Sequence, residues 1–230
     1  MTINTKSQKI LIVDDEADII EFVQFNLEKE KFVTETASDG NQAIKIAKTF
    51  VPDLILLDIM MPGKDGIETC KVLRTMPELN QTLIVFLTAR NEDFVQISSF
   101  DAGGDDFIAK PIRPQLLVSK VKSLLRRNEK NEGKIEPNLT IGNLTINVER
   151  VEVAIDDVII NLPKKEFELL YLLASKPGKV FSREEIYRKI WGSEVIVGHR
   201  TIDVHIRKIR EKMGIDLIKT IKGLGYKFDY

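Results

Sequence analysis

The stretch Leu54-Ile55-Leu56-Leu57-Asp58-Ile59-Met60 constrains the fold of this chain more than any other. A run of branched apolar residues without polar alternation is typical of a strand that is buried on both faces of a parallel sheet. The run delivers a carboxylate, Asp58, and the next segment, Met61–Gly66, contains one Pro and two Gly, as tight loops do. The pattern predicts that Asp58 lies at an exposed rim of the sheet, although an Asp that merely begins a turn would look the same.

Four more short apolar runs alternate with helical patterns within residues 1–127: Lys9–Val13, Phe32–Ala37, Leu83–Leu87 and Phe107–Ala109. Five strands alternating with five helices predict a doubly wound, five-stranded parallel sheet, because parallel neighbours need helical crossovers. Ligands of such sheets bind beyond the carboxyl ends of the strands. Five polar residues that directly follow apolar runs are therefore expected at this one edge: Asp14, Asp15, Asp58, Thr88 and Lys110.

The 230-residue chain suits two domains, and its composition changes near residue 128. Residues 128–134 are all polar or Gly and predict a flexible linker. Residues 135–230 predict a small antiparallel sheet, then three helices at about 164–175, 183–190 and 198–213, and a closing hairpin with a Gly-containing turn. Residues 1–127 hold 16 Lys and Arg against 19 Asp and Glu, whereas residues 134–230 hold 17 against 14. Only the second half is thus expected to meet a polyanion.

Apolar runs and cysteine content indicate the cellular location of the protein. No apolar run approaches the roughly 18 residues that span a bilayer, and the first residues lack a secretory hydrophobic segment. We therefore expect a soluble, cytoplasmic protein without a membrane partner. Cys70 is the single cysteine, which excludes an intramolecular disulfide and favours a core-filling role.

The residues at the predicted sheet edge have a definite chemistry. Three converging carboxylates repel one another, and a divalent cation with hard oxygen ligands relieves this repulsion; Mg²⁺ is the natural candidate. Thr88 can donate to a phosphate oxygen, and Lys110 supplies a compact positive charge. Together they predict stabilisation of a phosphoryl group that moves onto Asp58.

At this point the sequence resembles a known family. Asp14-Asp15, Asp58, Thr88-Ala89 and Lys110-Pro111 look like the receiver domain, of flavodoxin-like fold, of two-component response regulators, over residues 9–127. The resemblance implies that Asp58 accepts a phosphoryl group from a sensor histidine kinase and that the Lys110-Pro111 bond is cis. It assigns catalytic and switch roles to Thr88, Lys110 and Phe107. It also implies a Mg²⁺ site formed by Asp14, Asp15, Asp58 and the backbone carbonyl of Met60.

The predicted helix over residues 199–213 carries two different faces. At 100° per residue, Ile202, Ile206, Ile209 and Met213 form one core-facing stripe. The opposite face carries Arg200, Val204, Arg207 and Lys208. A basic face alone is often just solvated, but Val204 among cations gains little from water and can meet a thymine methyl group in a major groove.

The runs Gly198–Arg210 and Thr220–Phe228 are similar to the winged-helix effector domain of the OmpR/PhoB family, over about residues 135–230. The resemblance implies that the last helix enters the major groove of double-stranded DNA, that the hairpin is a wing, and that residues 193–197 contact RNA polymerase. The DNA-binding residues it implies are Arg200, Thr201, Val204, Arg207, Lys208, Arg210 and Lys222. Lys208 stands where Arg is common in the family. Because Lys cannot form the bidentate contact that Arg forms with guanine, we expect this protein to prefer a different base at that contact.

The resemblance also implies a homodimer on phosphorylation. In this subfamily, ion pairs on the fourth and fifth receiver helices commonly join two receivers. Here Gln96 and Leu116 stand where a basic and an acidic residue often pair, so we expect a partly apolar contact. The predicted interface residues are Gln96, Asp105, Asp106, Leu116 and Lys120, with Asp105 and Lys120 as a retained pair.

These features favour a phosphorylation-gated transcription regulator, which is not an enzyme beyond its own phosphorylation and slow dephosphorylation. Its two effector domains would bind tandem half-sites about one DNA turn apart. Two alternatives stay open: a DNA binder that ignores phosphorylation, and a metal-dependent phosphohydrolase with an Asp nucleophile. The second would need a substrate pocket and a general acid, and Met60 stands where such an enzyme has a second Asp.

Overall fold

The computed structural model describes residues 7–89, 101–131, 138–192 and 200–230. Its contacts divide the chain into two compact units, Met1–Leu125 and Arg126–Tyr230. The helix α5, Pro114–Asn131, runs across this division. The expected linker therefore needs a correction, since residues 128–131 are helical: no Gly or Pro occurs between Pro114 and Gly133, and Glu and Lys are good helix formers.

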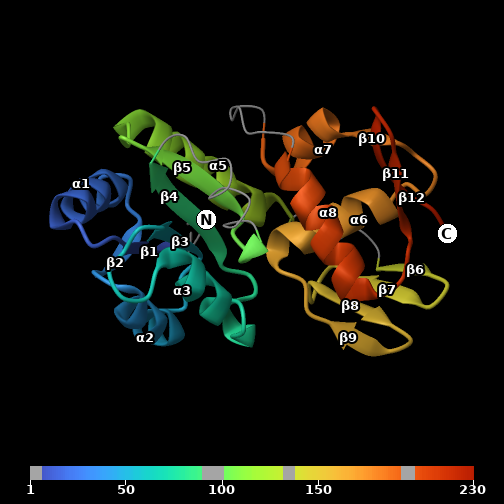
Figure 1. Ribbon diagram of the computed structural model, residues 1–230, viewed down its shortest axis with the longest axis horizontal. Coiled ribbons are helices and arrows are strands. Elements are labelled where there is room, and N and C mark those ends of the chain that lie inside the picture. The colour runs from blue at the N-terminus through green and yellow to red at the C-terminus, as the bar shows by residue number, and fades with distance from the viewer. Residues whose placement is uncertain (1–6, 90–100, 132–137, 193–199) are drawn as a thin grey trace, which may run out of the picture. The chain divides into compact units, whose positions relative to one another are not determined.

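The first unit contains the predicted parallel sheet (Figure 1). Its strand order is β2-β1-β3-β4-β5, and every neighbouring pair is parallel. The strands are β1 Lys9–Val13, β2 Val33–Ala37, β3 Leu54–Asp58, β4 Leu83–Ala89 and β5 Asp106–Lys110. The described helices are α1 Ala17–Glu28, α2 Gly40–Phe50, α3 Gly66–Leu73 and α5, with a short 3₁₀ helix, η1 Pro77–Leu79. The helix expected at about 93–101 falls almost wholly outside the described residues.

Strand β3 is buried on both faces, as its uninterrupted apolar run predicts. Leu54 and Leu56 belong to one core, together with side chains of α1 and α5. Ile55 and Leu57 belong to a second core, with side chains of α2 and α3. Helices thus cover both faces of the sheet, which leaves the strand ends as the place where polar groups gather.

In its described part, residues 138–192 and 200–230, the second unit combines two antiparallel sheets with three helices (Figure 1). The first sheet has the order β6-β7-β8-β9, and the second the order β10-β12-β11. Its strands are β6 Leu139–Ile141, β7 Leu144–Asn147, β8 Glu152–Ile155, β9 Val158–Ile160, β10 Phe181–Ser182, β11 Ile218–Ile221 and β12 Gly225–Phe228. The helices are α6 Lys164–Ala174, α7 Arg183–Ile190 and α8 Arg200–Met213. Strand β10 was not predicted, because two residues are too few to show a period.

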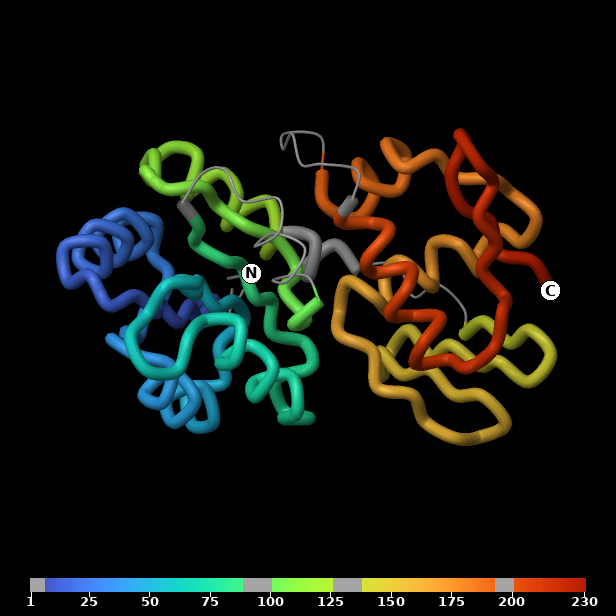
Figure 2. Tube along the Cα trace, in the orientation of Figure 1, coloured from blue at the N-terminus to red at the C-terminus, as the bar shows by residue number. Residues whose placement is uncertain are grey.

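The β11–β12 hairpin follows α8 and ends the chain (Figure 2). Its turn contains Gly223, whose φ of +74° is left-handed, a conformation that L side chains rarely adopt. Gly225 is required for another reason: a Cβ there would lie 2.0 Å from the carbonyl oxygen of Phe181 on β10. The Gly-x-Gly-Tyr pattern therefore fixes both the turn and the close pairing of β12 with β10.

Candidate functional site

The parallel sheet brings the predicted polar residues to one edge. Asp14 follows β1 and Asp58 ends β3, and these strands are neighbours with Val13 opposite Leu57. Thr88 lies near the end of β4, and Lys110 ends β5 opposite Ala89. The placement follows from topology alone, because all strands of a parallel sheet finish on the same side.

Helix α3 begins directly against the end of β3, and Gly66 makes this possible. A Cβ at Gly66 would lie 2.0 Å from the backbone oxygen of Asp58, so only glycine fits here. The Gly66 amide donates to the Ile59 carbonyl at 3.0 Å. Asp65 caps α3 by accepting from the Glu68 amide at 2.7 Å. The loop after Asp58 is therefore held tightly against the rim.

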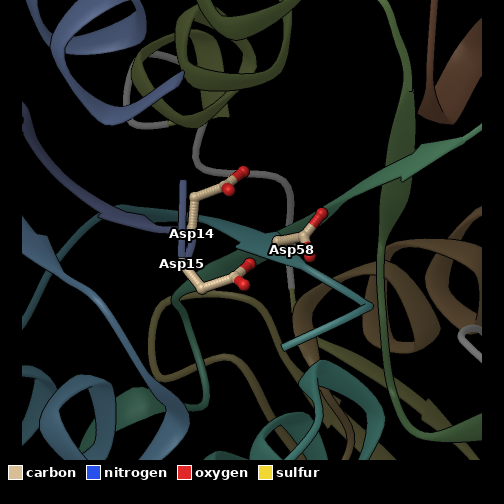
Figure 3. A group of neighbouring side chains, drawn as sticks. All are labelled: Asp14, Asp15 and Asp58. Atoms are coloured by element: carbon tan, nitrogen blue, oxygen red, sulfur yellow. The ribbon is translucent and has the colours of Figure 1, made fainter. Parts of the chain in front are cut away.

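Three carboxylates converge at this rim, as the sequence predicted. Asp14, Asp15 and Asp58 each offer a carboxylate oxygen, and these oxygens lie within 4.8 Å of one another (Figure 3). Asp14 and Asp58 are buried, whereas Asp15 is exposed. Backbone amides support the two buried groups: Met60 N donates to Asp58 Oδ2 at 2.8 Å, and Glu16 N donates to Asp14 Oδ1 at 3.1 Å.

Lys110 joins the two buried carboxylates. Its Nζ lies 2.9 Å from Asp14 Oδ2 and 2.8 Å from Asp58 Oδ1, with Glu16 Oε1 further away at 3.4 Å. Burial lowers the pKa of the Lys110 ammonium, but its hydrogen bonds to Asp58 and Asp14 outweigh burial and hold the pKa above its ordinary value. Burial raises the pKa of the Asp14 carboxyl, against the opposing contact with Lys110. The Lys110-Pro111 peptide bond is cis, as expected.

The donor set fits a divalent cation of the magnesium type. Each of the three side-chain ligands is a carboxylate oxygen, which hard cations prefer. Among the described residues, these three carboxylates against the ammonium of Lys110 leave an excess of two negative charges, which one divalent ion would balance. The Met60 amide already lies against Asp58, and the Met60 carbonyl stays a predicted ligand.

Thr88 and Phe107, the predicted switch residues, lie on β4 and β5. Thr88 is buried, one strand away from Asp58. Phe107 is half-buried, and the Nζ of Lys120 lies 5.2 Å from the centre of its ring and donates to its backbone carbonyl. The aromatic side chain is therefore held by a cation of α5, a contact that the sequence pattern did not indicate.

Most of the predicted dimer residues have partners within their own chain. Asp105 pairs with Arg74 at 2.5 Å, and Lys120 pairs with Asp106 at 2.9 Å; the three residues Asp105, Asp106 and Lys120 are buried. The Asp105–Lys120 pair was expected between two receivers and stays a prediction, although each of the two residues already has a partner in its own chain. Leu116 is 48% exposed, and Gln96 lies outside the described residues.

Arg74 itself was missed by sequence reasoning. Besides Asp105, its guanidinium binds the Gly103 and Thr82 carbonyls, each at 2.8 Å, and so joins the end of α3 to the segments around β4 and β5. A single basic residue at a helix end gives no pattern that could have identified this role.

Helix α8 buries a wider arc than its apolar stripe predicts. Thr201 and Val204 are 3% and 9% exposed, so neither offers the free surface that was expected for DNA contact. The ring of Trp191 lies 5.4 Å from that of His205, which shows that α8 also packs outside the stripe. Arg207 stays on the exposed side at 55%, and Lys208 is half-buried.

The remaining predicted DNA contacts divide into three groups. Arg210 has partners within its own chain: its guanidinium donates to the Ile218 carbonyl at 2.6 Å and to Thr220 Oγ1 at 2.9 Å, so it braces β11 against α8, and its contact with DNA stays a prediction. Lys222 is exposed on the hairpin, as expected. Arg200 begins α8, but its side chain, like the predicted polymerase loop 193–197, lies outside the described residues.

Comparisons with known proteins agree with this geometry. Residues 10–122 match the family described as "Response regulator receiver domain", and residues 157–228 match "Transcriptional regulatory protein, C terminal". The transcriptional regulatory protein ResD of Bacillus subtilis is 39% identical over 98% of this chain and 97% of its own length. The alkaline phosphatase synthesis transcriptional regulatory protein PhoP of the same organism is 39% identical over 97% of each chain. A solved structure of DrrB, a Thermotoga maritima OmpR/PhoB homologue, covers 98% of this chain and 100% of its own at 31% identity and a TM-score of 0.51.

A receiver sheet with an acidic rim, followed by a DNA-binding effector unit, defines a response regulator of a two-component system. The family that matches the second domain is described as a transcriptional regulatory protein, and both relatives are named transcriptional regulatory proteins. The chain belongs to the OmpR/PhoB family of response regulators. No helix within the described residues is long and apolar enough to cross a bilayer.

Proposed function

We propose that a sensor histidine kinase phosphorylates this protein on Asp58, in a step that requires Mg²⁺, and that phosphorylation controls its binding to DNA. The observation that carries the proposal is the convergence of Asp14, Asp15 and Asp58 within 4.8 Å, with Lys110 Nζ 2.8 Å from Asp58. An isolated carboxylate at a turn would need neither the acidic neighbours nor the ammonium group that contacts it.

The chain's own residues divide the chemistry between them. A carboxylate oxygen of Asp58 attacks the phosphorus atom of the donor. The bond between phosphorus and the donor's leaving group breaks, the leaving group takes the bonding electrons, and Asp58 becomes an acyl phosphate. Lys110, which already contacts Asp58, stays within reach of the added negative charge, and Thr88 on the next strand supplies a hydroxyl donor. Mg²⁺ held by Asp14, Asp15, Asp58 and the Met60 carbonyl would neutralise charge on the transferring group.

Exposing the protein to a small phosphodonor such as acetyl phosphate tests this proposal. We expect Mg²⁺-dependent phosphorylation of the wild type, detected by intact mass, and none of Asp58→Asn. Asp65→Asn is the matched control, because Asp65 only caps α3 and Asn caps a helix nearly as well. Phosphorylation of Asp58→Asn at the wild-type rate would refute the assignment.

The gating itself has a separate test. Phosphorylation should tighten DNA binding of the wild type, and Asp58→Asn should bind equally with or without phosphodonor. Identical binding of the wild type in both conditions would instead support the phosphorylation-independent alternative. The proposed targets are tandem DNA half-sites, and the proposed partner at these sites is RNA polymerase. We therefore propose that the protein acts in the cytoplasm.

Pairing of two receivers is the proposed link between phosphorylation and DNA binding, because a dimer raises the effective concentration of its second effector domain. The exposed Leu116 on α5 supports a partly apolar contact. Leu116→Glu should weaken the phosphorylated dimer in sedimentation experiments, whereas the same charge at the neighbouring exposed Gln115 should matter less. Equal sedimentation of Leu116→Glu and wild type would remove this contact from the interface.

We further propose that the acidic rim serves only the protein's own phosphorylation and slow dephosphorylation. Incubation with a range of phosphomonoesters should release at most about one phosphate per protein molecule. Many turnovers would instead support the phosphohydrolase alternative.

A further inference from the structure

Tyr226 on β12 joins three separate elements of the effector unit. Its hydroxyl donates to Asp203 Oδ1 of α8 at 2.6 Å and accepts from Arg183 Nη2 of α7 at 3.1 Å. Arg183 Nε also binds Asp203 Oδ1 at 2.8 Å, which closes the triangle. The hairpin strand, the first turn of α8 and the start of α7 thus meet at one cluster, which we call the Tyr226 cluster: Arg183, Asp203, Arg210 and Tyr226.

Two guanidinium groups approach the Tyr226 ring. The Arg183 guanidinium carbon lies 4.8 Å from the ring centre, and that of Arg210 lies 6.0 Å away. Arg210 also donates to β11 through Ile218 and Thr220, so it too connects α8 with the hairpin. The ring is 4% exposed, and its position follows from the Gly225 contact that draws β12 onto β10.

The protonation states suit this arrangement. Burial, reinforced by the hydrogen bond to Asp203, raises the pKa of Tyr226 to about 12, so the hydroxyl keeps its proton and donates at neutral pH. The hydrogen bond to Asp203 raises the pKa of Arg183, which is charged in any case.

Asp203 is unexpected for a helix that binds a polyanion. Its side chain is 47% exposed on the same side of α8 as Arg207, where a carboxylate repels phosphate groups. Glu211 shares that side at 61% exposed, but the structure gives it a 3.8 Å ion pair with Arg207 only. Asp203 differs from Glu211 because it reaches across to two other elements.

We propose that Asp203 is a positioning residue for DNA binding: through Tyr226 and Arg183 it fixes the β11–β12 hairpin relative to α8. The inference rests on the proposed DNA contacts of these two elements. A duplex is stiff and presents phosphates and grooves at set spacings, so Arg207 on α8 and Lys222 on the hairpin reach it together only when their separation is set beforehand. The favourable effect of Asp203 on geometry thus outweighs the repulsion of its charge.

Replacement of the two carboxylates gives opposite expectations. Asp203→Ala and Glu211→Ala each remove one negative charge from the exposed side of α8 and each introduce a good helix former. The full-length protein is titrated with a duplex that it has selected from a random-sequence pool. We expect Glu211→Ala to bind as tightly as wild type or more tightly, and Asp203→Ala to bind about tenfold more weakly, as the loss of a charge-assisted hydrogen bond implies. Asp203→Asn, which keeps an acceptor oxygen, should recover part of the loss.

A double-mutant comparison separates positioning from a general loss of structure. Lys222→Ala should weaken wild-type binding, but should cost clearly less when Asp203 is already Ala, because the hairpin is then no longer held in place. If Asp203→Ala fails to fold, Tyr226→Phe decides: it keeps the buried ring and removes only the hydroxyl, and we expect about threefold weaker binding.

Two results would overturn this inference and leave the proposed function intact. One is that Asp203→Ala binds the duplex as tightly as Glu211→Ala; the other is that the losses of affinity caused by Asp203→Ala and Lys222→Ala are additive. Wild-type affinity of Tyr226→Phe would overturn it as well. If Arg207→Ala and Lys222→Ala both bind like wild type, the proposed DNA contacts are wrong, and the inference falls with them.

Discussion

The acidic rim of the receiver and helix α8 of the effector unit arrange their charged side chains in opposite ways. The rim gathers the carboxylates of Asp14, Asp15 and Asp58; two of them are buried, and among the described residues Lys110 lies between these two. The effector unit instead pairs each carboxylate of α8 with an arginine, Asp203 with Arg183 and Glu211 with Arg207. An excess of negative charge that attracts cations is typical of sites that carry out chemistry. The Asp203–Arg183 pair instead joins two helices, whereas the Glu211–Arg207 pair lies within α8.

Of the variants considered, Lys110→Ala should change the stability of its unit most, because it removes the cation from the acidic rim. Removal of one partner from a buried ion pair costs roughly 3–5 kcal/mol, and the two buried carboxylates would then repel each other. The loss should shrink as pH falls, because Asp14, whose pKa burial already raises, then takes up a proton. Thermal unfolding of the receiver with increasing Mg²⁺ measures the effect: we expect Mg²⁺ to stabilise Lys110→Ala much more than wild type.

Glu16→Gln is the control for this measurement, since Glu16 is exposed and lies 3.4 Å from Lys110. Its stability should change by less than about 0.5 kcal/mol. If Mg²⁺ stabilises Lys110→Ala no more than wild type, the rim does not carry the excess of negative charge that its geometry suggests.

The acidic rim could be predicted from the sequence because it depends on topology alone. Once Leu54–Asp58 and its neighbours are recognised as parallel strands, their ends must share an edge, whatever packs around them. What the apolar runs could not predict is how the loop after Asp58 is held. That depends on a contact between Gly66 and the Asp58 backbone, which only coordinates reveal.

Gly66→Ala should destabilise the receiver by about 1–3 kcal/mol, the usual cost of overpacking, because its Cβ would lie 2.0 Å from the Asp58 oxygen. It should also slow phosphorylation, since the backbone beside Asp58 must shift. Gly63→Ala is the control: Gly63 has a φ of +80° but open space around it, so it should cost only about 1 kcal/mol. Equal phosphorylation rates for both variants would show that the α3 contact does not position Asp58.

The face of α8 was predicted less well, and the reason is physical. Helical periodicity identified the core stripe of Ile202, Ile206 and Ile209, all of which are buried. It placed Val204 on the opposite, exposed face, however, whereas Val204 is buried. Thr201 and Arg210 were implied by the family resemblance, which does not show that Thr201 is buried or that the Arg210 guanidinium is already bound to the strand beside it.

Arg207 and Lys208 are predicted DNA contacts on α8 that stay at least partly exposed, and their roles can be tested separately. Arg207→Ala should weaken binding to all duplexes by about 1 kcal/mol and flatten the salt dependence of binding by about one unit, as loss of one phosphate contact does. Lys208→Ala should instead change which sequences the protein selects from a random pool. If the two effects are exchanged, the roles assigned to the two residues are exchanged as well.

The smallest expected effect concerns the titration of Tyr226. Its pKa is raised from 10.0 to about 12 by burial and by the hydrogen bond to Asp203, so the folded state favours the protonated hydroxyl. The resulting stabilisation is fully present below pH 10 and is lost as pH rises from 10 to about 12. Tyrosinate absorbance of the wild type minus Tyr226→Phe isolates this residue, and Asp203→Ala should move its midpoint downward. A midpoint near 10 in the folded wild type would mean that Tyr226 is neither buried nor bound to Asp203 as the structure has it, and the Asp203–Arg183 pair would lose its link to the hairpin.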